Sequence, residues 1–289
     1  MTHSRIVHRV MAGPHWRRVP TRRKVGLLIS GSVILVGLFG SFIAPYSPTA
    51  FVGAPFALPS QSHLLGTDEL GRDVLSRVLA GGRTVVILGF LAATLAIASG
   101  TALGLIAAQR RGVVDEVIMR LGDILLAFPQ MILALLFVSV LGSHLWLIVL
   151  VVGLSAAPQI ARIMRTAAAS ALLQDYIAAA QMQGASRFHI LLREVLPNIL
   201  APLRVQAGLR VTYSVQIIAA LSFLGLGVLP PQADWGLMIG ENRLGLTSNP
   251  WSVLVPVMAL ALLTIGMTFA SAGDTSIARL ESIAVPGNE

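Results

Sequence analysis

The clearest potential for chemistry in this sequence lies in a short charged stretch, GTDELGRDVLSR. It places the carboxylates Asp68, Glu69 and Asp73 beside Arg72 and Arg77. Paired carboxylates can act as general acid and base, or they can bind a metal ion. The neighbouring arginines disfavour a cation, and no constellation of nucleophile and base accompanies the carboxylates. As a helix, the stretch would pair Asp68 with Arg72 and Asp73 with Arg77, four residues apart. We therefore expect an interfacial helix that braces its surroundings.

Other kinds of reactive site are missing from the sequence. His63, His144 and His189 are scattered and predict no metal site. The chain has no cysteine, which excludes disulfides, thiolate catalysis and cysteine metal ligands. It also lacks the GxxxxGK[ST] loop that holds nucleotide phosphates. We expect no catalytic residue, no bound metal and no activity as an enzyme.

The composition indicates what kind of elements must position these residues. Of the 289 residues, 55% are hydrophobic and 12% are charged, and the mean hydropathy is +0.79. Soluble domains carry about 25% charged residues, so the expected fold class is an all-α membrane protein. Six apolar runs approach the roughly 20 residues that cross a bilayer, and none contains Asp, Glu, Lys or Arg. These expected spans are residues 25–44, 84–108, 124–141, 145–161, 211–229 and 251–273.

The distribution of basic residues predicts the orientation of the spans. If the amino terminus is cytoplasmic, the inner segments hold 17 of the 21 Lys and Arg residues and the outer segments hold four. This asymmetry predicts that both termini are cytoplasmic. The net charge of +8 suggests contact with anionic lipid head groups and not with nucleic acid.

The inner segment 162–210 contains QDYIAAAQMQGASRFHILLREVLPN, which is too polar to cross a bilayer. It predicts a short helix that ends at Gly184, a second helix capped by Ser186, and an end before Pro197. A helix whose crest is alanine can seat in a groove of another protein, with Tyr176 as one anchor and Ile177 as another. Two amphipathic helices on the inner leaflet remain an equally weighted alternative.

Several residues inside or beside the expected spans indicate helix contacts. Gly100 and Gly104 form a small-xxx-small pair that permits close packing of two helices. Arg120 and Asp123 share a helix face and either pair or simply anchor a membrane boundary, the latter being favoured. Pro129 interrupts the third run and can kink it. Asp234 and Trp235 follow the fifth run, where Trp suits a membrane interface and contact with a docked protein is a weaker possibility.

The inner loop resembles the EAA loop of binding-protein-dependent ABC importers. Its alanines Ala178, Ala179 and Ala180 take the positions of the Glu-Ala-Ala signature, with Ala178 where the family has Glu. Gly184 and the Leu196–Pro197 pair fall at the expected spacing. By this resemblance, the coupling helix that contacts an ATPase comprises Asp175, Tyr176, Ala178, Ala179, Ala180, Gly184, Ala185, Ser186 and Pro197.

Four further blocks are similar to permeases for dipeptides, oligopeptides and nickel. They are HLLGTDELGRDVLSRVLAGGR, RLGDILLAFPQMILA, APQIARIMR and ALSFLGLGVLPPQADWGLMI, and with the EAA loop they extend over residues 20 to 275. The first block implies a structural motif near the translocation path, made of Gly66, Asp68, Gly71, Arg72, Asp73 and Arg77.

The resemblance implies a type-I ABC importer permease fold of six helices in a bacterial cytoplasmic membrane. It implies import of short peptides, with nickel or another small solute as the alternative. The implied partners are a homologous second permease, two ABC ATPase subunits, an extracytoplasmic binding protein and membrane lipid. No cofactor is expected on this chain, because the partner subunits use ATP and magnesium. The implied divisions are a basic segment 1–24, a first span with outer loop and interfacial helix 25–83, a transmembrane domain 84–273 with its EAA loop at about 162–206, and a tail 274–289.

Overall fold

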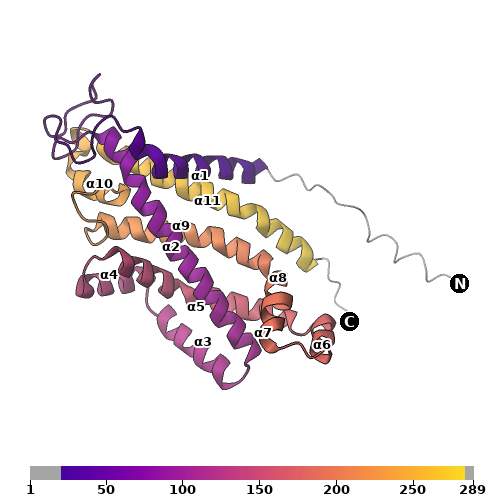
Figure 1. The fold of residues 1–289 in the computed structure, drawn as a ribbon. Helices are drawn as coiled ribbons and strands as arrows, with labels where there is room; N and C mark the ends of the chain where they lie inside the picture. Colours follow the sequence, from indigo (N-terminus) through magenta and orange to yellow (C-terminus); the bar gives the residue numbers. More distant parts are fainter. Residues whose placement is uncertain (1–20, 284–289) are drawn as a thin grey trace.

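The computed structural model of the chain describes residues 21–283, and in this range the regular elements are all helical. The expected basic segment 1–24 lies mostly outside the described residues, as does the end of the expected tail. Five long helices form the body of the protein (Figure 1). They are α1 Thr21–Phe39, α2 Val74–Gln109, α5 Leu145–Ala171, α9 Leu200–Phe223 and α11 Trp251–Ile283.

The long helices pack through small residues and apolar side chains. A Cβ on Gly100 of α2 would lie 2.6 Å from the carbonyl oxygen of Ala157 on α5, and one on Gly104 would lie 2.6 Å from that of Ala161. These glycines therefore let α2 and α5 approach closely, as their spacing predicted. A larger core forms where α2, α5 and α9 meet, with Val85 and Ile218 fully buried. In Figure 1, α1 and α11 run side by side along one edge of this body.

By length and composition, four described helices can cross a membrane, namely α1, α2, α5 and α11. A fifth candidate is the pair α3 Val113–Leu126 and α4 Gln130–Leu141, which are bent by 81° at a short break. Pro129 lies in this break and confirms the predicted interruption. The helix of the fifth expected span, α9, fails this test because polar side chains such as Arg210 and Gln216 lie within it.

The outer loop departs from the prediction in its secondary structure. The charged stretch is not a helix before Val74, because Gly66 and Gly71 adopt left-handed backbone conformations with φ of 71° and 75°. From Val74 onward, α2 runs unbroken through the expected boundary at residue 84 to Gln109, a length of about 54 Å. The separate interfacial helix was therefore wrong, since its second half is the first part of α2.

The inner loop forms a set of short helices at the end of the bundle opposite the outer loop (Figure 1). We call residues 175–198 the elbow. The elbow contains α6 Asp175–Met182, α7 Arg187–His189, the π-helix η3 Ile190–Val195 and α8 Leu196–Asn198. At the other end lie α10 Trp235–Asn242 and two 3-10 turns, η2 Gly40–Phe42 and η4 Arg243–Thr247.

Candidate functional site

The elbow brings all of its predicted site residues together on one surface. Asp175 and Tyr176 open α6, and Ala178 is exposed while Ala179 and Ala180 are half-buried. Ile177 is only 1% exposed and packs against the chain's own core, so its prediction as an anchor for a partner was wrong. The middle of α6 therefore presents small side chains between the larger Tyr176 and Met182, which permits another backbone to approach closely there.

Gly184 ends α6 in the manner its position predicted. Its φ is 81°, and the N–H of Ala185 donates to the carbonyl of Ala180 at 3.1 Å, as in a Schellman cap. A Cβ at Gly184 would meet no atom within 4 Å. The Ser186 hydroxyl accepts from the N–H of His189 at 3.2 Å, which confirms the predicted cap of the next helix. The space beside Gly184 is thus open to a partner.

The second helix of the elbow does not end before Pro197. Helical structure continues from Arg187 to Asn198, with the π-helix η3 directly ahead of the proline. A proline ring collides with the carbonyl four residues earlier in a regular α-helix. The wider π-turn relieves this collision, so the helical segment can continue through Pro197. The proline itself is exposed.

The elbow carries large apolar side chains that the chain itself leaves uncovered. Leu173, which directly precedes the elbow, is 73% exposed, Met182 is 84% exposed and Phe188 is 71% exposed. Tyr176 is 40% exposed, and its hydroxyl accepts from the side-chain amide of Asn198 at 3.1 Å. Exposed apolar side chains around a small-residue crest are typical of a surface that docks another protein.

The inner side of the elbow is joined firmly to the long helices. Ile177, Ile190 and Val195 are buried together with Met164 and Ala168 of α5. The side-chain amide of Gln109, at the end of α2, donates to the carbonyl of Arg187 at 2.8 Å. A displacement of the elbow is therefore transmitted to α5 and α2 through a packed apolar core.

Ion pairs near this end of the bundle connect α3 to α5. Arg162 pairs with Asp123, and Arg165 pairs with Asp115 through two hydrogen bonds. Arg120 instead pairs with Glu116 on its own helix at 2.6 Å. The considered pairing of Arg120 with Asp123 is therefore not formed.

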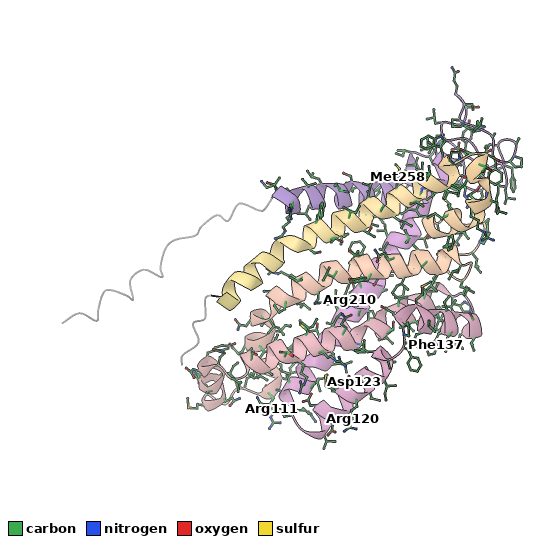
Figure 2. All side chains as sticks on the ribbon, turned by 180° about the vertical axis from the view of Figure 1, so that it is seen from behind. Arg111, Arg120, Asp123, Phe137, Arg210 and Met258 are labelled. Carbon is green, nitrogen blue, oxygen red and sulfur yellow. The ribbon has the colours of Figure 1, made fainter. Side chains whose placement is uncertain are left out.

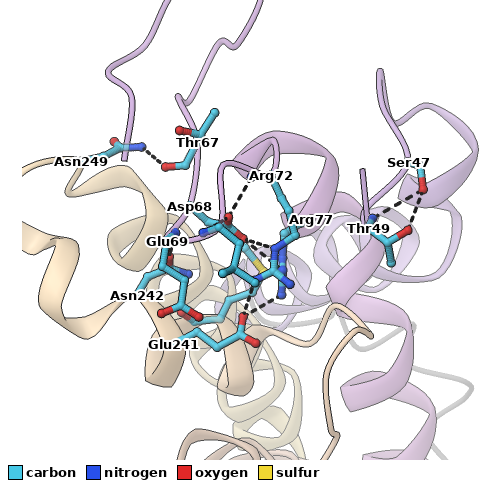
Figure 3. Close-up of polar contacts among 12 residues, drawn as sticks. Ser47, Thr49, Thr67, Asp68, Glu69, Arg72, Arg77, Glu241, Asn242 and Asn249 are labelled. Atoms are coloured by element: carbon cyan, nitrogen blue, oxygen red, sulfur yellow. Dashed lines mark hydrogen bonds and ion pairs between the residues drawn. The ribbon is translucent and has the colours of Figure 1, made fainter. Parts of the chain in front are cut away.

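At the opposite end, four buried charges form what we call the ion cluster (Figure 3). Asp68 binds Arg72 at 2.6 Å and Arg77 at 3.0 Å. Glu241 of α10 binds the same two arginines at 3.0 and 2.9 Å. The cluster therefore ties the outer loop and the start of α2 to α10.

The predicted Asp73–Arg77 pair does not occur. Asp73 instead caps α2, because its carboxylate accepts from the backbone N–H and hydroxyl of Ser76 at 2.8 and 2.7 Å. His63 lies 3.4 Å from the other oxygen of Asp73. Gly66 and Gly71 turn the loop where added Cβ atoms would collide with the carbonyl oxygens of Ala57 and Gly53. All six predicted motif residues thus belong to one compact structure.

Sequence reasoning missed the far side of this structure. Glu241, Asn242 and Asn249 lie far along the chain from the outer loop. Asn242 accepts from the N–H of Glu69 at 3.0 Å, and Asn249 donates to the carbonyls of Leu65 and Thr67 at 3.0 and 2.9 Å. The sequence signal that could have found Glu241 and Asn242 is the polar triplet at residues 241–243, which ends the apolar segment WGLMIG.

Burial perturbs the carboxyl groups at this end. It raises the pKa of Glu241 above its usual range, with nearby Arg72 opposing the change. It also raises the pKa of Glu69, and the charge of Glu241 adds to this effect. Burial raises the pKa of Asp234, the cap of α10, to about 6, although the N–H groups of Leu237 and Gly236 favour its charged form. These carboxyl groups become protonated more readily than exposed ones.

Trp235 lies inside the protein and not on its surface, where a tryptophan that contacts lipid at a membrane interface would be exposed. It is 1% exposed, and its indole N–H donates to the carbonyl of Val78 on α2 at 2.8 Å. The ring lies against Gly82, where a Cβ would come within 2.5 Å of it. Trp235 therefore fixes α10 to α2 from within.

Arg210 is a second residue that the sequence analysis placed wrongly. We expected it in the inner loop, but α9 begins at Leu200 and contains it. Its side chain is 4% exposed, and it donates to the side-chain oxygen of Gln159 on α5. Figure 2 shows Arg210 in the central part of the bundle. Helix α9, which contains most of the fifth expected span, therefore also contains a buried ionisable side chain.

The sequence was compared with protein-family profiles and with individual proteins, and both comparisons indicate the same family. The profile of the family described as "Binding-protein-dependent transport system inner membrane component" matches residues 100–272. The chain is 35% identical over 257 residues to a dipeptide transport system permease protein of Haemophilus influenzae, covering 86% of each chain. It is 35% identical over 255 residues to a di/tripeptide transport system permease protein of Pseudomonas aeruginosa, covering 86% of this chain and 84% of that one. It is 32% identical over 263 residues to a glutathione transport system permease protein of Pectobacterium atrosepticum, covering 89% and 87%.

Proposed function

This chain belongs to the family of inner membrane components of binding-protein-dependent transport systems, and we propose that it is the permease subunit of an ATP-driven importer of short peptides. Membership makes it a multi-pass membrane transport subunit and not an enzyme. The peptide substrate is supported by the names of relatives that align with most of the chain. Nickel or another small solute is the alternative within the same family.

In this proposal the chain crosses a bacterial inner membrane six times. The spans are α1, α2, the broken pair α3–α4, α5, α9 and α11. Apolar packing of α9 against α2, α5 and α11 supports its place as the fifth, although its polar side chains lower its hydropathy. The excess of basic residues in the segments that include the elbow supports a cytoplasmic position for this end and for both termini.

The proposed assembly contains a homologous second permease, two ABC ATPase subunits and an extracytoplasmic binding protein. The elbow would be the coupling element, with α6 seated in a groove of one ATPase subunit. ATP and magnesium would be bound by the ATPase subunits, and this chain would bind neither. The ion cluster would hold the extracytoplasmic end together near the translocation path.

The coupling mechanism follows from differential contact in two states. When ATP closes the ATPase pair, α6 moves with its groove. The buried contacts of Ile177, Ile190 and Val195 with α5 transmit this displacement to the bundle. The spans then rock and change the side from which the solute has access. The single observation that carries this proposal is the elbow, with an open, small-residue outer surface and a tightly packed inner surface.

The proposal is tested in proteoliposomes that contain the assembled importer and its binding protein. We expect uptake of a labelled dipeptide that requires ATP. Gly184→Trp should reduce uptake at least about tenfold while ATP hydrolysis and assembly persist, because the indole fills the space that the groove needs. Gly225→Trp is a matched control, since Gly225 has a similar φ of 77° and equally open surroundings at the other end of the bundle.

Each outcome bears on a separate part of the proposal. Normal peptide uptake with Gly184→Trp would refute the assignment of the elbow. ATP-dependent uptake of ⁶³Ni²⁺ without uptake of any peptide would replace the substrate class by the alternative. Peptide uptake that persists without the ATPase subunits would refute the proposal as a whole.

A further inference from the structure

Arg210 occupies a position where a cation is costly. It lies in α9 about 20 Å from the end of that helix at Phe223, and its partner Gln159 lies about 20 Å from the start of α5 at Leu145. Both residues are therefore well inside a hydrocarbon core about 30 Å thick if the helices span the membrane. Arginine stays charged at this depth, so its charge requires compensation.

The described part of the chain does not supply that compensation. Arg210 has two described partners, the neutral amide of Gln159 and the ring of Tyr213, whose centroid is 5.8 Å from the guanidinium carbon. Its Nε–H is buried without a hydrogen-bond partner in the described structure. No carboxylate among the described residues pairs with it. A cation that is 4% exposed thus keeps an unpaired donor and an unneutralised charge.

Several side chains close to Arg210 are polar and exposed. Tyr213 is 51% exposed, and Gln159 and Gln216 are exposed on neighbouring turns of α5 and α9. Polar side chains uncovered at this depth face a water-filled cavity or a protein interior. Gln216 also lines a groove between α9, α10 and α11, whose other lining residues are apolar except for Thr264. Tyr213 and Gln216 lie about one and two turns along α9 from Arg210, and we call these two exposed side chains the polar strip.

We infer that Arg210 binds a carboxylate of the solute as it passes along this strip. The inference rests on the proposed function, because every peptide with a free C-terminus offers a carboxylate. A guanidinium presents planar donors that match a carboxylate, and the amide of Gln159 can turn aside to admit it. Gln159 accepts a hydrogen bond from Arg210 but does not neutralise its charge. The guanidinium therefore remains able to bind an anion that is present only during transport. A carboxylate of the second permease is the competing partner, and the experiment separates the two.

The first test measures transport by the reconstituted importer with one binding protein throughout. The substrates are a labelled dipeptide with a free carboxylate and the same dipeptide with a C-terminal amide. We expect Arg210→Gln to lower uptake of the free acid about tenfold and to leave the amide within about twofold, since one charge-assisted contact is lost. Arg210→Lys should retain part of the preference. Arg204→Gln removes an exposed charge two turns away on α9 and should change neither substrate.

An equal loss of uptake for both substrates would assign Arg210 a purely structural role and overturn the inference. Normal uptake of both substrates by Arg210→Gln would overturn it as well. If Arg210→Gln releases the second permease from the purified complex, the cation belongs to the contact between subunits, which also overturns it.

The second test does not depend on the peptide substrate. The chain has no cysteine, so Tyr213→Cys creates its single thiol next to Arg210. The quantity measured is the labelling rate of an anionic thiosulfonate divided by that of a cationic one. This ratio should be about threefold higher with Arg210 present than in the Arg210→Gln background. A thiol that reacts with neither reagent, or a ratio that Arg210→Gln does not change, would overturn the inference. Charge-selective labelling without peptide uptake would leave the anion site standing while the proposed substrate fails.

Discussion

Replacing Arg77 by Met is expected to destabilise strongly the end of the bundle that contains α10. The ion cluster holds two arginines, Arg72 and Arg77, and two carboxylates, Asp68 and Glu241, so its charges balance. Arg77 and Asp68 are both fully buried. Met fills a similar volume but leaves Asp68 and Glu241 to share Arg72, so the cluster carries one buried negative charge in excess. Breaking such a pair costs about 3–5 kcal/mol, which corresponds to a fall in Tm of about 10 °C for a chain of this size.

The assay is thermal unfolding of the purified protein in detergent, with a second variant that restores the balance of charge. Arg77→Met/Glu241→Gln leaves Asp68 with Arg72 alone and should recover more than half of the lost stability. Arg120→Met removes an exposed ion pair and should cost less than about 1 kcal/mol. The argument is refuted if Arg77→Met lowers stability by less than about 1 kcal/mol, or if Glu241→Gln brings no recovery in that background.

Three further predictions concern packing, hydrogen bonding and pH. Gly100→Leu should destabilise by about 1–3 kcal/mol, because even its Cβ would meet the backbone of Ala157 at 2.6 Å, whereas Gly31→Ala meets nothing and should be neutral or stabilising in the same unfolding assay. Asn249→Leu should cost about 1–3 kcal/mol and loosen the outer loop, seen as faster amide hydrogen exchange at residues 65–67; unchanged exchange would count against the role of its two hydrogen bonds. The pKa of Asp234 is raised to about 6 in the folded protein, so its contribution to stability is fully present below about pH 4 and is lost as the pH rises through about 6. Tm should therefore increase from pH 7 to pH 5, and Asp234→Asn, which keeps a cap, should reduce this increase; an equal increase in the variant would contradict the assignment.

Local signals in the sequence predicted much of the elbow and of the helix packing. Gly184 and Ser186 end and begin helices because their conformations and hydrogen bonds involve only neighbouring residues. Gly100 and Gly104 predicted a close helix contact because glycines four residues apart in a membrane helix let another helix backbone approach closely. Features of this kind depend on short-range geometry, which spacing alone describes.

The misplaced features depend on partners far along the chain. Arg210 appeared to belong to a loop because its charge is unfavourable in a span, yet Gln159 on another helix accepts its hydrogen bond. Arg77 was assigned to Asp73 by spacing, but Asp68 and the distant Glu241 bind it. Helical spacing across the charged stretch ignored Gly71, although glycine is itself a signal for a turn.

The most direct test of the coupling role is a cross-link from the outer surface of α6. Ala178→Cys introduces the single thiol of the chain at an exposed position, and Leu64→Cys does so at the opposite end, where Leu64 is 64% exposed. In the assembled importer, a short bifunctional reagent should join Ala178→Cys to an ATPase subunit with a yield that changes when ATP is added. Leu64→Cys should give no such product. Failure of Ala178→Cys to reach the ATPase in an active complex, or equal linkage from Leu64→Cys, would contradict the account.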